Sequence, residues 1–160
     1  MFERLKTDAR VVILDAMQEA RVRADAKIEA EHLLLALARR STWDAGHILA
    51  DSGLDHDGLR IALNEGVRRT LEAVGVGSGP ALISDPALPV AGQPPWGESA
   101  KAALRRASII ARDHGNRRLN PTHILLGVLR AREGTVPRAL GTAGVDTAEL
   151  AARAEATLGQ

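Results

Sequence analysis

The chain has 160 residues, of which 45% are hydrophobic but only 2% are aromatic, and it contains no cysteine. This composition excludes disulfides, thiolate catalysis and cysteine-ligated zinc, and it favours a helical core of Ala, Leu, Val and Ile over a sheet. The 21 basic and 20 acidic residues leave a net charge of +1, which gives no electrostatic reason to expect a nucleic acid or an anionic membrane as partner.

Four helices are predicted in the first part of the chain. Apolar residues spaced three and four apart indicate a helix over residues 5–23, and short apolar segments indicate two more over 31–39 and 43–50. Asp55 is suited to cap a fourth helix over residues 55–71. Residues 75–97 are dense in Gly and Pro, which predicts a mobile linker or a long surface loop.

The second part of the chain repeats the first with an offset of 91 residues, the distance from His32 to His123. The same offset aligns Gly53 with Gly144, where a helix would end in a left-handed residue, and Asp55 with Asp146, where the next helix would be capped. We therefore predict an all-α fold of eight helices. Its two four-helix repeats, residues 1–74 and 98–160, are expected to pack face to face as one domain, joined by the linker 75–97.

The repeated segments carry a recognisable motif. Glu31-His32-Leu33-Leu34-Leu35-Ala36-Leu37 resembles the Glu-His-Ile-Leu-Leu-Gly-Leu signature of the N-terminal domain of ClpC-type AAA+ unfoldases, and Thr122-His123-Ile124-Leu125-Leu126-Gly127-Val128 is similar to a second copy. The opening Met1-Phe2-Glu3-Arg4 and the later Gln18-Glu19-Ala20 also resemble this family. The resemblance implies a double repeat of eight helices that sits on an ATPase ring and receives adaptors and substrates. Some family members bind phosphoarginine.

No ATPase chemistry is expected from this chain. It lacks a G-x-x-x-x-G-K-[ST] phosphate loop and any Gly-Lys pair, so the chain is either an excised N-terminal domain of an unfoldase or a free-standing paralogue, and we favour the second. The resemblance implies proteins or peptides as partners, namely Clp substrates, adaptors or other Clp components, with phosphoarginine or a cyclic peptide as a further ligand. With no apolar run of about 20 residues and no signal peptide, we expect a soluble cytoplasmic protein.

Glu31 is the first candidate site residue. The resemblance implies that the carboxylate at this point binds the guanidinium of phosphoarginine, and that nearby helix N-termini bind its phosphate. The alternative is a first-turn glutamate that stabilises its own helix. Thr122 stands at the matching point of the second repeat, where the family usually has glutamate, so we expect about one ligand per chain.

A second candidate is an apolar groove between the repeats for peptides and adaptors. The resemblance implies that it is lined by Phe2, Leu14, Met17, Trp96 and Lys101. The alternative is that Phe2 and Trp96 only close the interface between the repeats.

The remaining motifs favour structural roles. His32 and His123 lie among leucines and are predicted to be core histidines satisfied by backbone groups, while His47, His56 and His114 are expected to be isolated and exposed. No metal-ligand spacing and no nucleophile constellation is present, so we expect neither an enzyme nor a cofactor. Paired arginines such as those at 68–69 predict solvated helix faces.

Overall fold

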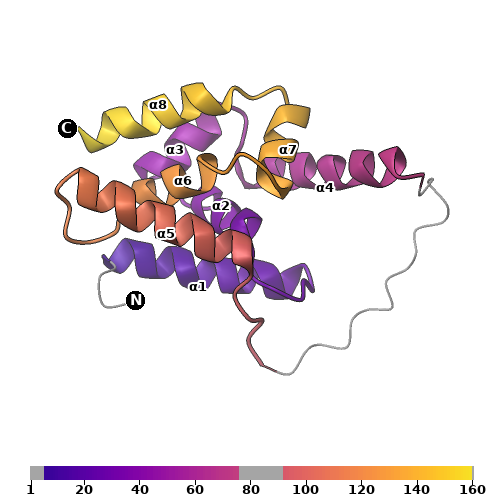
Figure 1. The fold of residues 1–160 in the computed structure, drawn as a ribbon, viewed down its shortest axis with the longest axis horizontal. Helices are drawn as coiled ribbons and strands as arrows, with labels where there is room; N and C mark the ends of the chain where they lie inside the picture. The colour runs from indigo at the N-terminus through magenta and orange to yellow at the C-terminus, as the bar shows by residue number, and fades with distance from the viewer. Residues whose placement is uncertain (1–5, 76–91, 160) are drawn as a thin grey trace.

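The computed structural model describes residues 6–75 and 92–159 of the chain. In these ranges the first repeat forms four helices, α1 (Thr7–Val22), α2 (Ala30–Ala38), α3 (Asp44–Asp51) and α4 (His56–Ala73). The second repeat forms α5 (Glu98–Asp113), α6 (Pro121–Leu129), α7 (Thr135–Thr142) and α8 (Thr147–Leu158) (Figure 1). The predicted all-α fold of eight helices in two repeats is therefore confirmed for the described part of the chain.

The helix bounds follow the predicted offset. Adding 91 to the first and last residues of α1, α2 and α3 gives the bounds of α5, α6 and α7, and α4 and α8 begin at equivalent residues. The two repeats differ at their ends, because α4 has 18 residues and α8 has 12.

Capping residues explain where these helices begin and end. The Asp55 carboxylate accepts a hydrogen bond from the Gly58 N–H at 2.9 Å, and Asp146 caps α8 in the same way, which satisfies N–H groups that have no partner inside the helix. Gly53 and Gly144 have φ angles of 76° and 72°, a left-handed conformation in which a side chain would be strained. Both predictions are confirmed.

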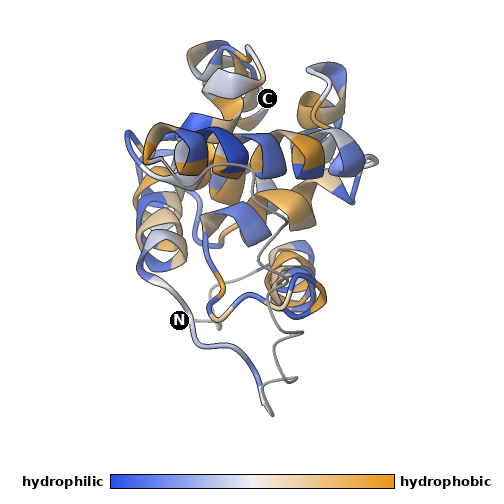
Figure 2. Cartoon of the chain, turned by 90° about the vertical axis from the view of Figure 1, so that its right-hand side faces the viewer, coloured by the Kyte–Doolittle hydropathy of each residue, from blue (hydrophilic) through white to orange (hydrophobic). Residues whose placement is uncertain are grey.

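The core lies between the two repeats. α2 and α6 contact each other at the centre, and their residues are almost entirely buried. The flanking helices pack in equivalent pairs, α5 on α2 and α1 on α6, then α7 on α4 and α3 on α8. The outer helices carry hydrophobic and hydrophilic residues side by side (Figure 2), as expected for helices with one face in a core. The predicted face-to-face packing is thus observed.

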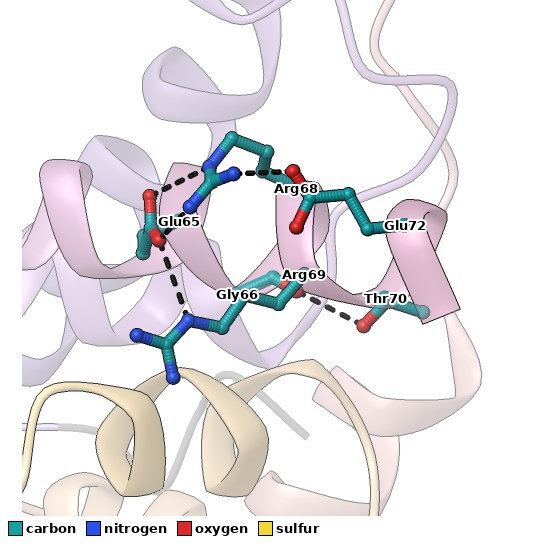
Figure 3. A network of polar contacts seen from close by, with 6 residues as sticks. All are labelled: Glu65, Gly66, Arg68, Arg69, Thr70 and Glu72. Carbon is teal, nitrogen blue, oxygen red and sulfur yellow. Dashed lines mark hydrogen bonds and ion pairs between the residues drawn. The ribbon is translucent and has the colours of Figure 1, made fainter. Parts of the chain in front are cut away.

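The exposed face of α4 carries a chain of ion pairs. Arg68 bonds Glu65 in the preceding turn and Glu72 in the following turn, and Arg69 also reaches Glu65 (Figure 3). Such pairs at spacings of three and four support a solvent-facing helix by a few tenths of a kcal/mol each. The arginines at 68–69 therefore lie on a solvated face, as their sequence pattern predicted.

The residues just before α5 are joined to the first repeat. The Ile28 N–H donates to the Pro95 carbonyl at 2.9 Å, and the Gly97 N–H donates to the Ile28 carbonyl at 2.8 Å. An equivalent bond joins the start of α1 to the second repeat, from the Lys6 N–H to the Leu119 carbonyl at 3.0 Å. Most of the predicted linker, residues 76–91, lies outside the described residues.

None of the helices that the structure describes is long and apolar enough to cross a membrane.

Candidate functional site

A cavity of about 350 Å³ lies between the two repeats at the beginning of α2. We call it the Glu31 pocket. Three parts of the chain line it: the N-terminus of α2, the first half of α5, and the segment that leads into α7. Its described lining residues are Glu29, Ala30, Glu31, Ser99, Ala102, Arg106, Ala131, Glu133, Gly134, Thr135, Val136, Pro137 and Arg138.

Glu31 lies in the first turn of α2 and is half-buried. Burial raises the pKa of its carboxyl; a hydrogen bond from its own backbone N–H and the charge of His32 oppose the rise, while the charges of Glu29 and Asp25 reinforce it. A cation in the pocket would relieve this accumulation of negative charge. Glu31 is therefore placed where it could pair with a guanidinium, although its role as a ligand-binding residue stays a prediction.

Glu29 and Ser99 join the two repeats at the edge of the pocket. The Glu29 carboxylate accepts hydrogen bonds from the Ser99 backbone N–H, at 3.1 Å, and from the Ser99 hydroxyl. That hydroxyl also accepts a bond from the Ala30 N–H at 2.9 Å. Glu29 therefore occupies the N-terminus of α5, a contact that sequence reasoning missed because its two partners are 70 residues apart.

Two arginines and Glu133 from the second repeat complete the charged lining. The Nε of Arg106 donates to the Gly127 carbonyl at 2.7 Å, and the Nε of Arg138 donates to the Gly134 carbonyl at 3.1 Å. Neither forms an ion pair with a carboxylate within residues 6–75 and 92–159. The pocket thus holds both negative and positive side chains, and no sequence pattern singled out either arginine.

The equivalent place in the second repeat has a different charge pattern. Thr122 replaces Glu31 and is buried, and the offset of 91 places Asp15 where the first pocket has Arg106. Asp15 is paired with Arg40 at 2.9 Å. Asn120 stands in place of Glu29 and caps α6 by accepting from the His123 N–H at 3.0 Å. This half of the molecule therefore lacks the combination of charges found around Glu31.

His32 and His123 are fully buried core residues, as predicted. The Nδ1 of His32 accepts a bond from the Glu29 N–H at 2.7 Å, and that of His123 accepts one from the Asn120 N–H at 3.0 Å. Each Nδ1 therefore acts as a hydrogen-bond acceptor and carries no proton. No group of three or more possible metal-ligating side chains occurs among the described residues.

The expectation that His56 is isolated and exposed is wrong. Its Nε2 lies 2.8 Å from a carboxylate oxygen of Glu19, which is buried and also accepts a bond from Arg39 at 3.0 Å. A buried carboxylate needs such partners to offset its lost hydration. The two residues are 37 positions apart in the sequence, so a local sequence pattern could not reveal the contact. His47 and His114 are exposed as expected.

The residues predicted for the peptide groove are placed as follows. Leu14 is 61% exposed, Met17 and Trp96 are partly buried against the core, and Lys101 is exposed and paired with Glu98 at 3.3 Å. Phe2 lies outside the described residues.

A larger cavity, of about 860 Å³, lies at the C-terminal end of α5. Sequence reasoning did not point to it, and it contains none of the predicted site residues. Its described lining residues are Ser108, Ile109, Arg112, Gly115, Asn116, Arg117 and Leu119.

Comparison with protein families finds one match over nearly the whole chain. The model of the Clp repeat (R) N-terminal domain matches residues 4–85 and 97–160. Among curated proteins, the chaperone protein ClpC, chloroplastic, of Pisum sativum is 29% identical over 150 residues, which are 94% of this chain and 14% of that protein. A ClpA homologue of Porphyra purpurea is 28% identical over the full chain, which spans 18% of it.

Solved structures show the same fold. The N-terminal domain of the chaperone ClpD from Arabidopsis thaliana matches with a TM-score of 0.73 and 23% identity, covering 100% of this chain and 97% of that one. The Hsp104 N-terminal domain from Candida albicans matches with a TM-score of 0.65 and 17% identity, covering 94% and 88%. At these identities the likeness concerns the fold alone.

Proposed function

This chain belongs to the Clp repeat N-terminal domain family, and from that premise we propose that it is a non-catalytic module that recognises substrates, adaptors or phosphoarginine-marked proteins for Clp-type proteolysis. The chain spans 14% of the length of pea ClpC. Any link to an ATPase, on the same chain or on a separate one, is therefore part of the proposal. The same holds for a free-standing role, whether client delivery, competition for adaptors or ligand scavenging.

The observation that carries the phosphoarginine part is the position of Glu31. Its carboxylate lines a cavity between the repeats, and burial raises its pKa. A guanidinium offers a planar fork of N–H donors that matches a carboxylate. The pairing would therefore satisfy the Glu31 charge and orient the ligand in one step.

The second proposed surface is the peptide and adaptor groove of Phe2, Leu14, Met17, Trp96 and Lys101. It is supported by the resemblance to the family and by the large exposed fraction of Leu14, 61%. An exposed apolar side chain would suit a peptide, linear or cyclic, that carries apolar groups.

Isothermal titration with free phosphoarginine tests the main proposal. We expect binding to the parent chain with about one site and loss of binding in Glu31→Ala, because the guanidinium loses its proposed carboxylate partner. Glu149→Ala is the matched control, since Glu149 is also a first-turn acid, on α8. Helix stability should change by only about 0.3–1 kcal/mol in either variant. Full binding by Glu31→Ala would contradict the proposal.

A further inference from the structure

A phosphoarginine side chain carries opposite charges on adjacent groups. A pocket that binds it needs a carboxylate for the guanidinium and cationic or N–H donors for the phosphoryl oxygens. The described lining of the Glu31 pocket contains two kinds of possible donors. One is the set of helix N-termini of α2, α5 and α7, and the other is the pair of arginine side chains, Arg106 and Arg138.

The N-terminus of α5 already holds an anion. Helix N-termini attract anions because their first N–H groups have no partner inside the helix. Here the Glu29 carboxylate accepts from the backbone N–H and the hydroxyl of Ser99. A Cβ atom at Gly97, the N-cap of α5, would lie 2.0 Å from a Glu29 carboxylate oxygen, so Glu29 fills this place closely. A phosphoryl group could bind there only by displacing it.

The N-terminus of α2 is also satisfied from within the chain. The Ala30 N–H donates to the Ser99 hydroxyl at 2.9 Å, and the His32 N–H donates to the Glu29 carbonyl at 3.0 Å. Two of the first three N–H groups of this helix are therefore engaged, and the third belongs to Glu31, whose carboxylate would repel an anion.

The two arginines have unused donors. Each has committed its Nε to a backbone carbonyl, Arg106 to Gly127 and Arg138 to Gly134, and a guanidinium has five N–H donors in all. Burial, with the charge of the neighbouring Arg105, lowers the pKa of Arg106, as happens where a cation has no nearby counter-charge. Arg138 is exposed and lies near the N-terminus of α7. The positive end of the α7 dipole there adds to the attraction for an anion.

We propose that Arg106 and Arg138 bind the phosphoryl group of a ligand whose guanidinium pairs with Glu31, and that Glu29 keeps the N-terminus of α5 closed to it. This inference rests on the proposed function and adds the residues that hold the anionic half. The first repeat then binds the guanidinium and the second repeat binds the phosphoryl group, so the ligand spans the interface between the repeats.

Titration calorimetry on the full 160-residue chain tests the assignment with two probes, phosphoarginine and unphosphorylated arginine amide. Arg138→Gln should weaken phosphoarginine binding by about tenfold or more, the loss expected for a charge-assisted hydrogen bond, and change arginine amide binding by less than about twofold. Arg105→Gln is the matched control, because Arg105 is exposed and does not line the pocket. Arg106→Gln should behave like Arg138→Gln, with its melting temperature measured because Arg106 also bonds α6.

Glu29→Gln separates the two donor sources. If the phosphoryl group binds at the arginines, this variant should change phosphoarginine affinity only slightly. Tighter binding by Glu29→Gln with unchanged binding by Arg138→Gln would place the phosphoryl group at α5 and overturn the inference.

If the parent chain does not bind phosphoarginine, the proposed ligand is refuted. Inorganic phosphate then tests the anion site separately. The NMR signals of the arginine Nε–Hε groups are followed while phosphate is added at constant ionic strength. Shifts of the Arg106 and Arg138 signals, with the Arg105 signal unmoved, would support the anion site by itself. Absence of those shifts would overturn it.

Discussion

Two buried histidines, each of which accepts the N–H of the residue three positions before it, differ in what contacts their other ring nitrogen. The Nε2 of His32 lies 2.7 Å from the Asp25 carboxylate, whereas the Nε2 of His123 lies 3.3 Å from the side-chain amide of Asn116. Asp25 and Asn116 are equivalent under the offset of 91. A carboxylate places a negative charge beside the buried ring, and an amide does not.

The acid sensitivity of His123 gives the first prediction at this scale. Burial, with the charges of His114 and Lys6, lowers its pKa to about 4, while an unfolded histidine titrates near 6.5. Between about pH 6.5 and 4 the unfolded chain binds the proton and the folded chain does not. The free energy of unfolding should therefore fall as pH falls through this window, by at most about 1.4 kcal/mol per pH unit for one proton.

Urea denaturation at pH 7 and pH 5 measures this effect. His123→Gln should show a shallower pH dependence than the parent chain, because the titrating group is gone. His47→Gln is the control, since it also removes a histidine, but one whose side chain is 71% exposed. Equal slopes for the parent and His123→Gln would refute the assignment.

Sequence reasoning reached some of these residues and not others. Both histidines could be predicted, because a His inside a run of leucines at a helix start has few alternatives to a backbone partner. Arg106, Arg138 and the Glu29–Ser99 contact could not, since each depends on two segments far apart in the chain meeting at the repeat interface. Family resemblance pointed to Glu31 because its motif is contiguous, but gave no information on the partners around it.

At the scale of elements, the closeness of α5 to α6 depends on one glycine. A Cβ atom at Gly127 would lie 2.2 Å from the Ala103 carbonyl oxygen and 3.1 Å from the Ala107 Cβ. The equivalent residue of α2 is Ala36, so α1 leaves room for a methyl group where α5 does not. The small residues along α5 thus allow an approach that the first repeat does not have.

Gly127→Ala should therefore destabilise the chain by about 1–3 kcal/mol, the usual range for overpacking a core, although alanine is the better helix former. Gly141→Ala on α7 is the matched control, because no atom lies within 4 Å of the added Cβ and the change should stabilise by about 0.5–1 kcal/mol. Chemical denaturation compares both with the parent. A Gly127→Ala variant as stable as the parent would show that α5 can move away without loss.

The helices were predictable because the pattern that defines them occurs twice in the sequence. Capping residues, left-handed glycines and apolar spacing recur at an offset of 91, and one repeat checks the other. The contacts between the repeats were harder to predict from the sequence. The packing of α4 on α7 and of α8 on α3 depends on which helix faces remain apolar after α2 and α6 have packed together. Leu14 is likewise 61% exposed because no other helix covers its face of α1, and the sequence of α1 alone does not reveal this.

At the scale of the whole molecule, the repeat is symmetric in backbone and asymmetric in charge. The two central helices and their flanking pairs are equivalent, yet Glu31 and Arg106 of the first pocket correspond to Thr122 and Asp15. Arg138 corresponds to His47. The duplicated fold therefore offers two equivalent places, of which one has the charges for a ligand with both a cation and an anion.

This asymmetry predicts the number of ligands per chain. Thr122→Glu alone should not create a second phosphoarginine site, because the phosphoryl group would meet Asp15, already paired with Arg40, instead of an arginine. The new carboxylate would also replace a buried threonine, which raises its pKa and opposes the charged form that a guanidinium needs. Titration calorimetry should therefore still give about one site.

A second site should require the positive partners as well. The triple variant Asp15→Arg, His47→Arg and Thr122→Glu rebuilds the charge pattern of the Glu31 pocket in the second repeat, and we expect it to raise the stoichiometry toward two if the chain remains folded. The triple variant carrying Glu31→Ala in addition provides the control, because binding to it can come only from the rebuilt site. A second site of equal affinity in Thr122→Glu alone would show that the carboxylate suffices and that the arginines of the second repeat contribute nothing to the selection of one pocket over the other.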